Sequence, residues 1–341
     1  MMLYNVFINQ ANLFLEVHIM TVKEIVSAIK AERPNITSVC FVGCGASMSE
    51  LFPGKYFLEA NSRRLRVSIY TANEFNYSTP VSVDESAIVV TCSLSGNTPE
   101  TVAASKKAMD LGAAVISVTH IEGSPLALAS HYQIIHGFEA SYAAKMEKMT
   151  DVLMLSAEIL NTYEGYDHYN AMEDGFSKIY GLIETAAAMS FPAAKAFAEN
   201  YKDMPILYVM SSGATQMVSY SFSSFLMMEM QWIPSSAFHD GEFFHGPFEM
   251  VETGVPYLLL MNDGPTRPMD SRALTFLQRF DAKVTVLDAK DFGLSSHIDK
   301  SVAEYFNPML ISGVLRIYAE QLAAIRSHPL TKRRYMWKLD Y

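Results

Sequence analysis

Three hydroxyl side chains, Ser93, Ser95 and Thr98, lie within six residues of one another. An apolar, β-branched run over 87–92 predicts a buried strand before them, and helical spacing over 100–111 predicts a helix after them. Free backbone N–H groups and the helix dipole favour an anion at such a strand-to-helix turn. Because the turn contains no Lys or Arg, its hydroxyl and amide donors predict binding of a sugar phosphate monoester rather than a nucleoside triphosphate.

An ordinary helix cap is the alternative interpretation of this turn. Thr98 would then cap the helix, and Pro99 would occupy its first position. That interpretation leaves Ser93 and Ser95 without a role, so phosphate binding is favoured.

A second turn of small residues follows a strand predicted over 38–42. Gly43 and Gly45 resemble the start of a dinucleotide-binding turn, but the third glycine is absent and no acidic residue ends the next strand. We therefore expect Gly45 to let the backbone approach a ligand closely, and Ser47 to add a hydroxyl to the same pocket. Ligands of open parallel sheets bind at the carboxyl ends of strands, where both turns lie.

Glu229 is a candidate general base because the residues around it, over 222–232, are mostly apolar. Loss of water raises the pKa of a carboxyl group toward the range useful for proton transfer. A glutamate paired with a neighbouring Lys or Arg is an equally weighted alternative.

His245 lies between aromatic residues and Gly246-Pro247, where a loop would present its imidazole to a ligand. A hydrogen-bonded core histidine is the alternative. A metal site that joins His245 to His239, Glu242 and Glu249 is disfavoured by the His-x5-His spacing, so no metal is expected.

The last fourteen residues, 328–341, form a basic cluster in a chain whose formal net charge is −10. A solvated tail is the default interpretation of such a run. Three aromatic residues interleave with the charges and favour a tail that packs. It would close over an anionic ligand as a lid, with Lys338 or an arginine supplying the missing positive charge.

Composition limits the class of protein. The chain has 341 residues, 50% hydrophobic and 18% charged, which fits a globular protein of two domains. The acidic balance argues against nucleic acid as a partner, and the absence of an apolar run of about 18 residues argues against a membrane segment. Three cysteines (Cys40, Cys44 and Cys92) fit small buried residues in a reducing cytoplasm.

Strands alternate with helices in two blocks, which predicts an α/β fold with parallel sheets flanked by helices, doubly wound as in flavodoxin. Strands are predicted over 38–42, 67–70, 87–92, 114–118 and 132–135, then over 206–210, 236–239, 256–261 and 283–288. Long helices are predicted over 48–60, 141–163, 174–201, 215–231 and 301–327. The predicted units are an N-terminal extension (1–20), a first domain (21–163), a second domain (164–327) and a C-terminal lid or tail (328–341).

Together these motifs resemble the SIS (sugar isomerase) family. The resemblance rests on Cys-Gly-Ala-Ser at 44–47, Ser-Leu-Ser-Gly-Asn-Thr at 93–98, and a glutamate sixteen residues before the histidine of Gly-Glu-Phe-Phe-His-Gly-Pro at 241–247. It implies two tandem SIS domains and a homodimer with shared active sites. The roles it implies are phosphate binding by Ser47, Ser93, Ser95 and Thr98, proton transfer by Glu229, and contributions from His245 of the neighbouring subunit and from Lys338.

Residues 20–341 also look like the bacterial deglycases of phosphorylated Amadori compounds, such as fructoselysine 6-phosphate and 6-phosphofructose-aspartate. This resemblance implies hydrolysis of a fructosamine 6-phosphate to glucose 6-phosphate and a free amino acid, through an enaminol and without a metal or organic cofactor. Asp240 departs from the pattern, because small residues are common there in these relatives. The alternatives are an aldose–ketose phosphosugar isomerase and a sugar-phosphate sensor without catalysis.

Overall fold

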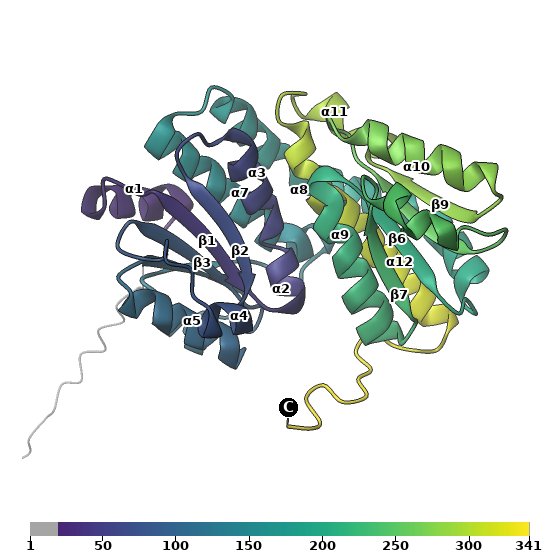
Figure 1. The fold of residues 1–341 in the computed structure, drawn as a ribbon, viewed down its shortest axis with the longest axis horizontal. Coiled ribbons are helices and arrows are strands. Elements are labelled where there is room, and N and C mark those ends of the chain that lie inside the picture. Colours follow the sequence, from purple (N-terminus) through teal and green to yellow (C-terminus); the bar gives the residue numbers. More distant parts are fainter. Residues whose placement is uncertain (1–19, 341) are drawn as a thin grey trace, which may run out of the picture.

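The computed structural model describes residues 20–340, which form two halves that each contain a parallel β-sheet (Figure 1). The predicted N-terminal extension lies outside the described residues, except for Met20. Parallel sheets flanked by helices confirm the predicted α/β class.

The first half contains five parallel strands in the order β2-β1-β3-β4-β5. They are β1 (Ser38–Gly43), β2 (Arg66–Thr71), β3 (Ala87–Cys92), β4 (Ala114–Thr119) and β5 (Tyr132–Ile135). Its helices are α1 (Val22–Glu32), α2 (Gly45–Ser49), α3 (Phe52–Asn61), α4 (Ala72–Tyr77), α5 (Pro99–Asp110), α6 (Pro125–Leu128) and α7 (Tyr142–Glu164). Strands β1, β3 and β4 are buried along their whole length, so their sequences are continuous apolar runs.

The second half contains four parallel strands in the order β7-β6-β8-β9. They are β6 (Leu207–Ser211), β7 (Ser235–His239), β8 (Pro256–Met261) and β9 (Lys283–Asp288). Its helices are α8 (Tyr169–Tyr201), α9 (Gln216–Ser221), α10 (Arg267–Arg279), α11 (Leu294–His297) and α12 (Asn307–Ile325), with a π-helix, η2, over Phe222–Gln231. In chain order, the second sheet repeats the arrangement of the first four strands of the first sheet.

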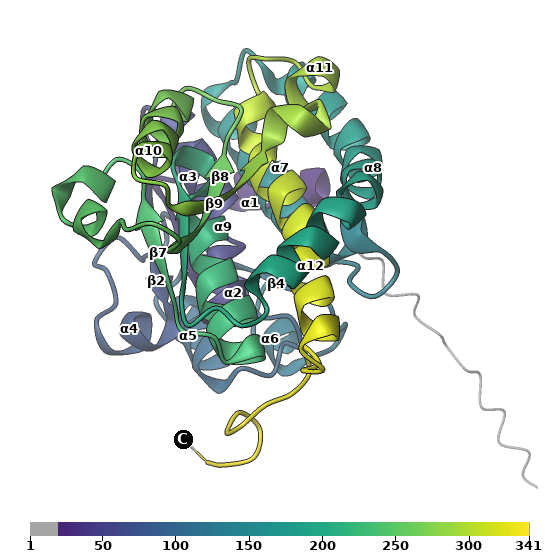
Figure 2. The ribbon, with the colours of Figure 1, turned by 90° about the vertical axis from the view of Figure 1, so that its right-hand side faces the viewer.

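One apolar core joins the two halves. It extends from Ile25 and Val39 in the first half to Leu258 and Leu322 in the second. Helix α12 lies alongside α8 within this core (Figure 2). The two sheets are therefore fixed relative to each other by shared packing, which positions residues of both halves at one site.

Two helices differ from the sequence prediction. The helix predicted over 48–60 is broken into α2 and α3, because Pro53 in the first turn of α3 cannot donate the N–H that a continuous helix needs. The helix predicted over 215–231 changes to π-helical geometry at Phe222, and it ends at Trp232 in the left-handed conformation (φ 55°). Glu229 lies in this π-helical segment, a geometry found frequently at functional sites.

Close packing of α3 on α7 generates a test of the fold. A Cβ at Gly54 would lie 2.8 Å from Val152 Cγ1 and would overlap the side chain of Ser156. We expect Gly54→Ala to lower the free energy of unfolding by about 1–2 kcal/mol, since overpacking exceeds the gain of about 1 kcal/mol in helix propensity. Denaturant unfolding measures the change.

Gly181 in α8 provides the control, because a Cβ there meets nothing within 4 Å. Gly181→Ala should stabilise the protein by about 1 kcal/mol. Equal effects of the two substitutions would contradict the tight contact between α3 and α7.

Candidate functional site

The turn between β3 and α5 brings two hydroxyl groups together. Ser93 directly follows β3 and is buried, and its Oγ lies 2.9 Å from Oγ1 of Thr98. Thr98 occupies the N-cap position of α5, but its side chain makes no capping hydrogen bond. The hydroxyl of Thr98 therefore faces the turn instead of closing the helix, which disagrees with the ordinary cap interpretation.

The conformation of this turn depends on Gly96. Its φ of +67° lies in the left-handed region, and a Cβ would overlap the side chain of Ser124. Leu126 N donates a hydrogen bond to Gly96 O at 3.0 Å, which fastens the turn to the start of α6. Ser95 is exposed at the tip, where its Oγ accepts a hydrogen bond from Asn97 N at 3.3 Å.

The second predicted turn, between β1 and α2, lies at the same edge of the sheet. Gly45 has a φ of +56°, and a Cβ built on it would lie 3.5 Å from the ring of Phe225 in η2. Ser47 and Leu94 line one cavity of about 200 Å³. The two turns therefore meet at one cavity, to which Ser47 and Leu94 contribute, and a helix of the second half packs beside them. We call Gly45, Ser47, Ser93, Ser95 and Thr98 the hydroxyl cradle.

Positive charge reaches this cavity from α7. Lys145 and Lys148 both line it. Lys148 is 3% exposed and forms an ion pair with Glu50, whereas Lys145 donates to Phe138 O at 3.3 Å and has no carboxylate partner within residues 20–340. These lysines were not predicted from the sequence, because the surrounding stretch 146–153 mixes four apolar with four polar residues and gives no sign that Lys148 is buried.

Glu229 is half-buried on η2 and pairs with an arginine of the C-terminal tail. Arg333 Nη2 lies 2.8 Å from Glu229 Oε1. Burial raises the pKa of Glu229, and the charge of Arg333 and its hydrogen bond oppose that rise. The carboxylate is therefore partly dehydrated and also paired with an arginine, as the alternative interpretation expected, whereas its role as a general base stays a prediction.

The tail packs against the end of η2. Arg333 is buried, and Arg334 lies 4.2 Å from the centre of the Trp232 ring. Lys338 is exposed, and its Nζ donates to Arg333 O at 2.7 Å. The arginine rather than Lys338 is thus the cation at Glu229, a pairing that sequence spacing does not reveal.

The tail and η2 enclose a hollow of about 540 Å³ lined by Glu229, Trp232, Arg333 and Tyr335, among others. Met230, the next residue after Glu229, lines the cavity of the hydroxyl cradle instead. The structure therefore brings the helix of Glu229 onto the cradle, while its carboxylate faces the tail.

His245 lies apart from this group. It is exposed on the 3-10 turn Phe243–His245, and its imidazole makes no hydrogen bond, ion pair or ring contact with any described residue. Within a single chain, His245 therefore makes no hydrogen bond, ion pair or ring contact with Glu229.

Residues 20–340 contain neither a metal-binding cluster nor a helix that could cross a membrane. No group of three or more His, Cys, Asp or Glu side chains is arranged there to hold a metal ion. None of the helices in that range combines the length and apolar character needed to cross a bilayer.

Known proteins resemble the chain over most of its length. Fructosamine deglycase FrlB of Bacillus subtilis (strain 168) is 39% identical over 306 residues, which cover 90% of this chain and 93% of that protein. Fructoselysine 6-phosphate deglycase of Escherichia coli (strain K12) is 22% identical, over 89% of this chain and 86% of the relative.

A crystal structure from Salmonella typhimurium LT2, described as that of a candidate phosphosugar isomerase, superposes with a TM-score of 0.90 at 38% identity. The match covers 94% of this chain and 98% of that one. The SIS domain family matches residues 36–157, which include both turns of the hydroxyl cradle. With these matches, the chain belongs to the SIS-domain family that includes fructosamine deglycase FrlB.

Proposed function

We propose that this protein is a fructosamine-6-phosphate deglycase, an enzyme that hydrolyses its substrate to glucose 6-phosphate and a free amino acid. The observation that carries the proposal is a half-buried glutamate on a helix that packs against Gly45 in one turn of the hydroxyl cradle, next to the turn in which Ser93 and Thr98 are paired. The names of the relatives in Bacillus and Escherichia support the same reaction.

In this proposal the hydroxyl cradle binds the phosphate ester. Ser47, Ser93, Ser95 and Thr98 donate hydrogen bonds to its oxygens, and Lys145 and Lys148 supply positive charge nearby. Binding the end of the substrate that does not react fixes the sugar chain and orients its reactive carbons.

Glu229 then acts on the open-chain aminoketose as a general base. It removes a proton from C1 to give the enaminol, and it returns a proton to C2 to give the aldimine. Water adds to C1 of the aldimine, and the C1–N bond breaks to release the amine and the aldehyde of glucose 6-phosphate. Arg333 keeps Glu229 ionised in its half-buried position.

His245 acts in this proposal as an acid or base at ring opening or at the C2 oxygen. Its exposure and its lack of contacts within the described chain fit donation to a second copy. We therefore propose a homodimer with shared sites, in which Lys338 supports the site from the tail. Neither a metal nor an organic cofactor is required.

The proposed organisation is two tandem SIS domains, over 21–163 and 164–327, with 328–341 as the lid. The repeated strand order supports it. The turns after β1 and β6 also match, since Gly45 and Gly213 have φ values of +56° and +58°. A location in the cytoplasm fits the free thiols of Cys40, Cys44 and Cys92.

Supplying a fructosamine 6-phosphate and measuring products tests the function. Release of glucose 6-phosphate with free amine supports the deglycase. Interconversion of sugar phosphates without amine release would establish the isomerase instead, and binding without turnover would establish a sensor.

Glu229→Gln should lower kcat by about 10²-fold to 10⁴-fold, the range for loss of a general base. Binding of a phosphorylated substrate analogue, measured by calorimetry, should change little because the hydroxyl cradle is intact. Glu199→Gln, on an exposed part of α8, is the matched control. Full activity of Glu229→Gln would remove Glu229 from this role.

Ser93→Ala should weaken binding of sugar phosphates about 10-fold to 100-fold, since a hydrogen bond to a charged group contributes about 1.5–3 kcal/mol. The same analogue without its phosphate should bind both proteins equally. Ser177→Ala, at an exposed position of α8, should leave both affinities unchanged. An unchanged affinity of Ser93→Ala for the phosphorylated ligand would contradict the cradle.

Arg333→Gln should move the acidic limb of the profile of kcat/KM against pH to higher pH. Removing the cation takes away the interaction that opposes the raised pKa of Glu229, so the base is protonated at a higher pH. Arg334→Gln removes the same charge from an exposed position and should leave the limb in place. An unmoved limb in Arg333→Gln would show that the ion pair does not tune the base.

A further inference from the structure

The carboxyl edge of the second sheet has the same plan as the hydroxyl cradle. Ser212-Gly213-Ala214-Thr215 follows β6 as Cys44-Gly45-Ala46-Ser47 follows β1, and Gly213 has a positive φ like Gly45. Asn262 follows β8 as Ser93 follows β3. An anion at this edge would meet the same kinds of donor.

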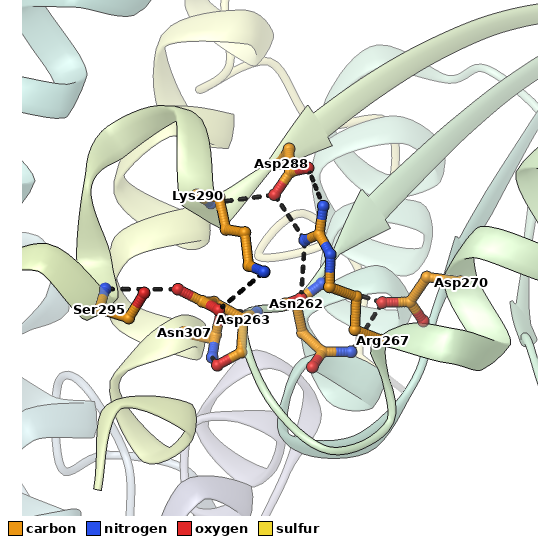
Figure 3. A network of polar contacts seen from close by, with 8 residues as sticks. All are labelled: Asn262, Asp263, Arg267, Asp270, Asp288, Lys290, Ser295 and Asn307. Atoms are coloured by element: carbon orange, nitrogen blue, oxygen red, sulfur yellow. Dashed lines mark hydrogen bonds and ion pairs between the residues drawn. The ribbon is translucent and has the colours of Figure 1, made fainter. Parts of the chain in front are cut away.

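That position is filled from within the chain. The carboxylate of Asp270, from the first turns of α10, accepts hydrogen bonds from Ser212 Oγ at 2.5 Å, Asn262 N at 2.9 Å and Asn262 Nδ2 at 2.7 Å. Figure 3 shows Asp270 beside Asn262, with Arg267 next to them. These three donors satisfy an ionised carboxylate in a fully buried place.

A second carboxyl group, that of Asp240, lies against Asp270. Asp240 is 1% exposed, and neither of its oxygens receives a hydrogen bond from a donor group in residues 20–340. It lies within hydrogen-bonding reach of the Asp270 carboxyl group. Two buried carboxylates in contact cannot both be ionised, so the pair holds one proton. Asp270 accepts three hydrogen bonds that stabilise its ionised form, so the proton is on Asp240.

We propose that Asp240 is a neutral acid whose O–H group donates a hydrogen bond to the Asp270 carboxylate and thereby holds the segment 239–245, which carries His245, against the second sheet. Asp240 is then a positioning residue. The claim that Asp240 positions His245 rests on the proposed function, in which His245 takes part in catalysis. The same segment is held by Asp240 N, which donates to Ser211 O at 2.9 Å, and by the fully buried ring of Phe243.

The other charged groups around the pair are already engaged. Arg267 pairs with Asp288 at the end of β9, and Lys290 lies 3.7 Å from Asp263 in the loop after β8. His239, at the end of β7, accepts a hydrogen bond from Gly241 N through Nδ1.

The shared proton makes stability depend on pH. Burial, together with Asp270, raises the pKa of Asp240 to about 9. A raised pKa in the folded state contributes stability that is complete below the ordinary value near 4 and is lost as the pH rises through about 9.

The test compares Asp240→Asn, which keeps a donor but cannot titrate, with Asp240→Ala and with wild type. From pH 5 to 9 the folding equilibrium constant of wild type should fall relative to that of Asp240→Asn, by up to about tenfold per pH unit. Near pH 6, Asp240→Asn should keep kcat/KM within about twofold of wild type, a margin near 0.4 kcal/mol. Asp240→Ala should lower kcat at least tenfold with KM retained, because the cradle is untouched.

Asp281→Asn is the matched control, since Asp281 is exposed and its positive φ suits asparagine. Its pH dependence of unfolding should follow that of wild type. If unfolding of Asp240→Asn has the same pH dependence as that of wild type, Asp240 does not hold a proton in the folded state. If kcat of Asp240→Ala is unchanged, Asp240 has no positioning role. If wild type releases no amine from any fructosamine 6-phosphate, the proposed function fails, while the unfolding measurements still decide whether Asp240 holds a proton.

Discussion

The packing of Phe225 on Gly45 is the contact on which the site depends. It joins the turn after β1 to the helix that carries Glu229, so residues from the two halves of the chain meet at one edge of the first sheet. Gly45 adopts a left-handed conformation there, in which the backbone of any residue with a side chain would be strained. The shared apolar core behind this contact holds the two halves at a fixed distance.

Charge at the site is distributed rather than concentrated. The turn after β3 contributes only hydroxyl and amide groups, while the lysines of α7 and the arginine of the tail approach from other elements. In a chain of net charge −10, these cations line the cavity of the hydroxyl cradle and the hollow beside the tail. Such an arrangement favours a small anion over an extended polyanion, which the rest of the surface would repel.

The sequence was most informative where burial determines the pattern. The strands over 87–92 and 256–261 were predicted with the bounds that the structure has, because fully buried parallel strands are continuous apolar runs between turns. The break between α2 and α3 was missed, although Pro53 marks it. The π-helical geometry around Glu229 was missed because it has no short sequence signature.

For the site, the predicted turns were brought together, but the partner of Glu229 was not found. The ion pair with Arg333 joins residues far apart in the chain, and hydrophobic periodicity carries no information about such a contact. Lys148 was missed for the same reason, since its position at the cavity beside Glu50 depends on how α7 packs in the folded chain. The roles of His245 and Lys338 remain predictions.

The carboxylate of Asp270 has a consequence for stoichiometry. It occupies the second sheet's counterpart of the hydroxyl cradle with a fixed negative charge and uses the donors that a phosphate group would need. A free anion approaching that edge would meet repulsion, and the Ser212 hydroxyl and the N–H groups of Asn262 are already engaged. Although the sheet is repeated along the chain, the proposed binding of a phosphate ester therefore involves one ligand per chain, at the edge of the first sheet.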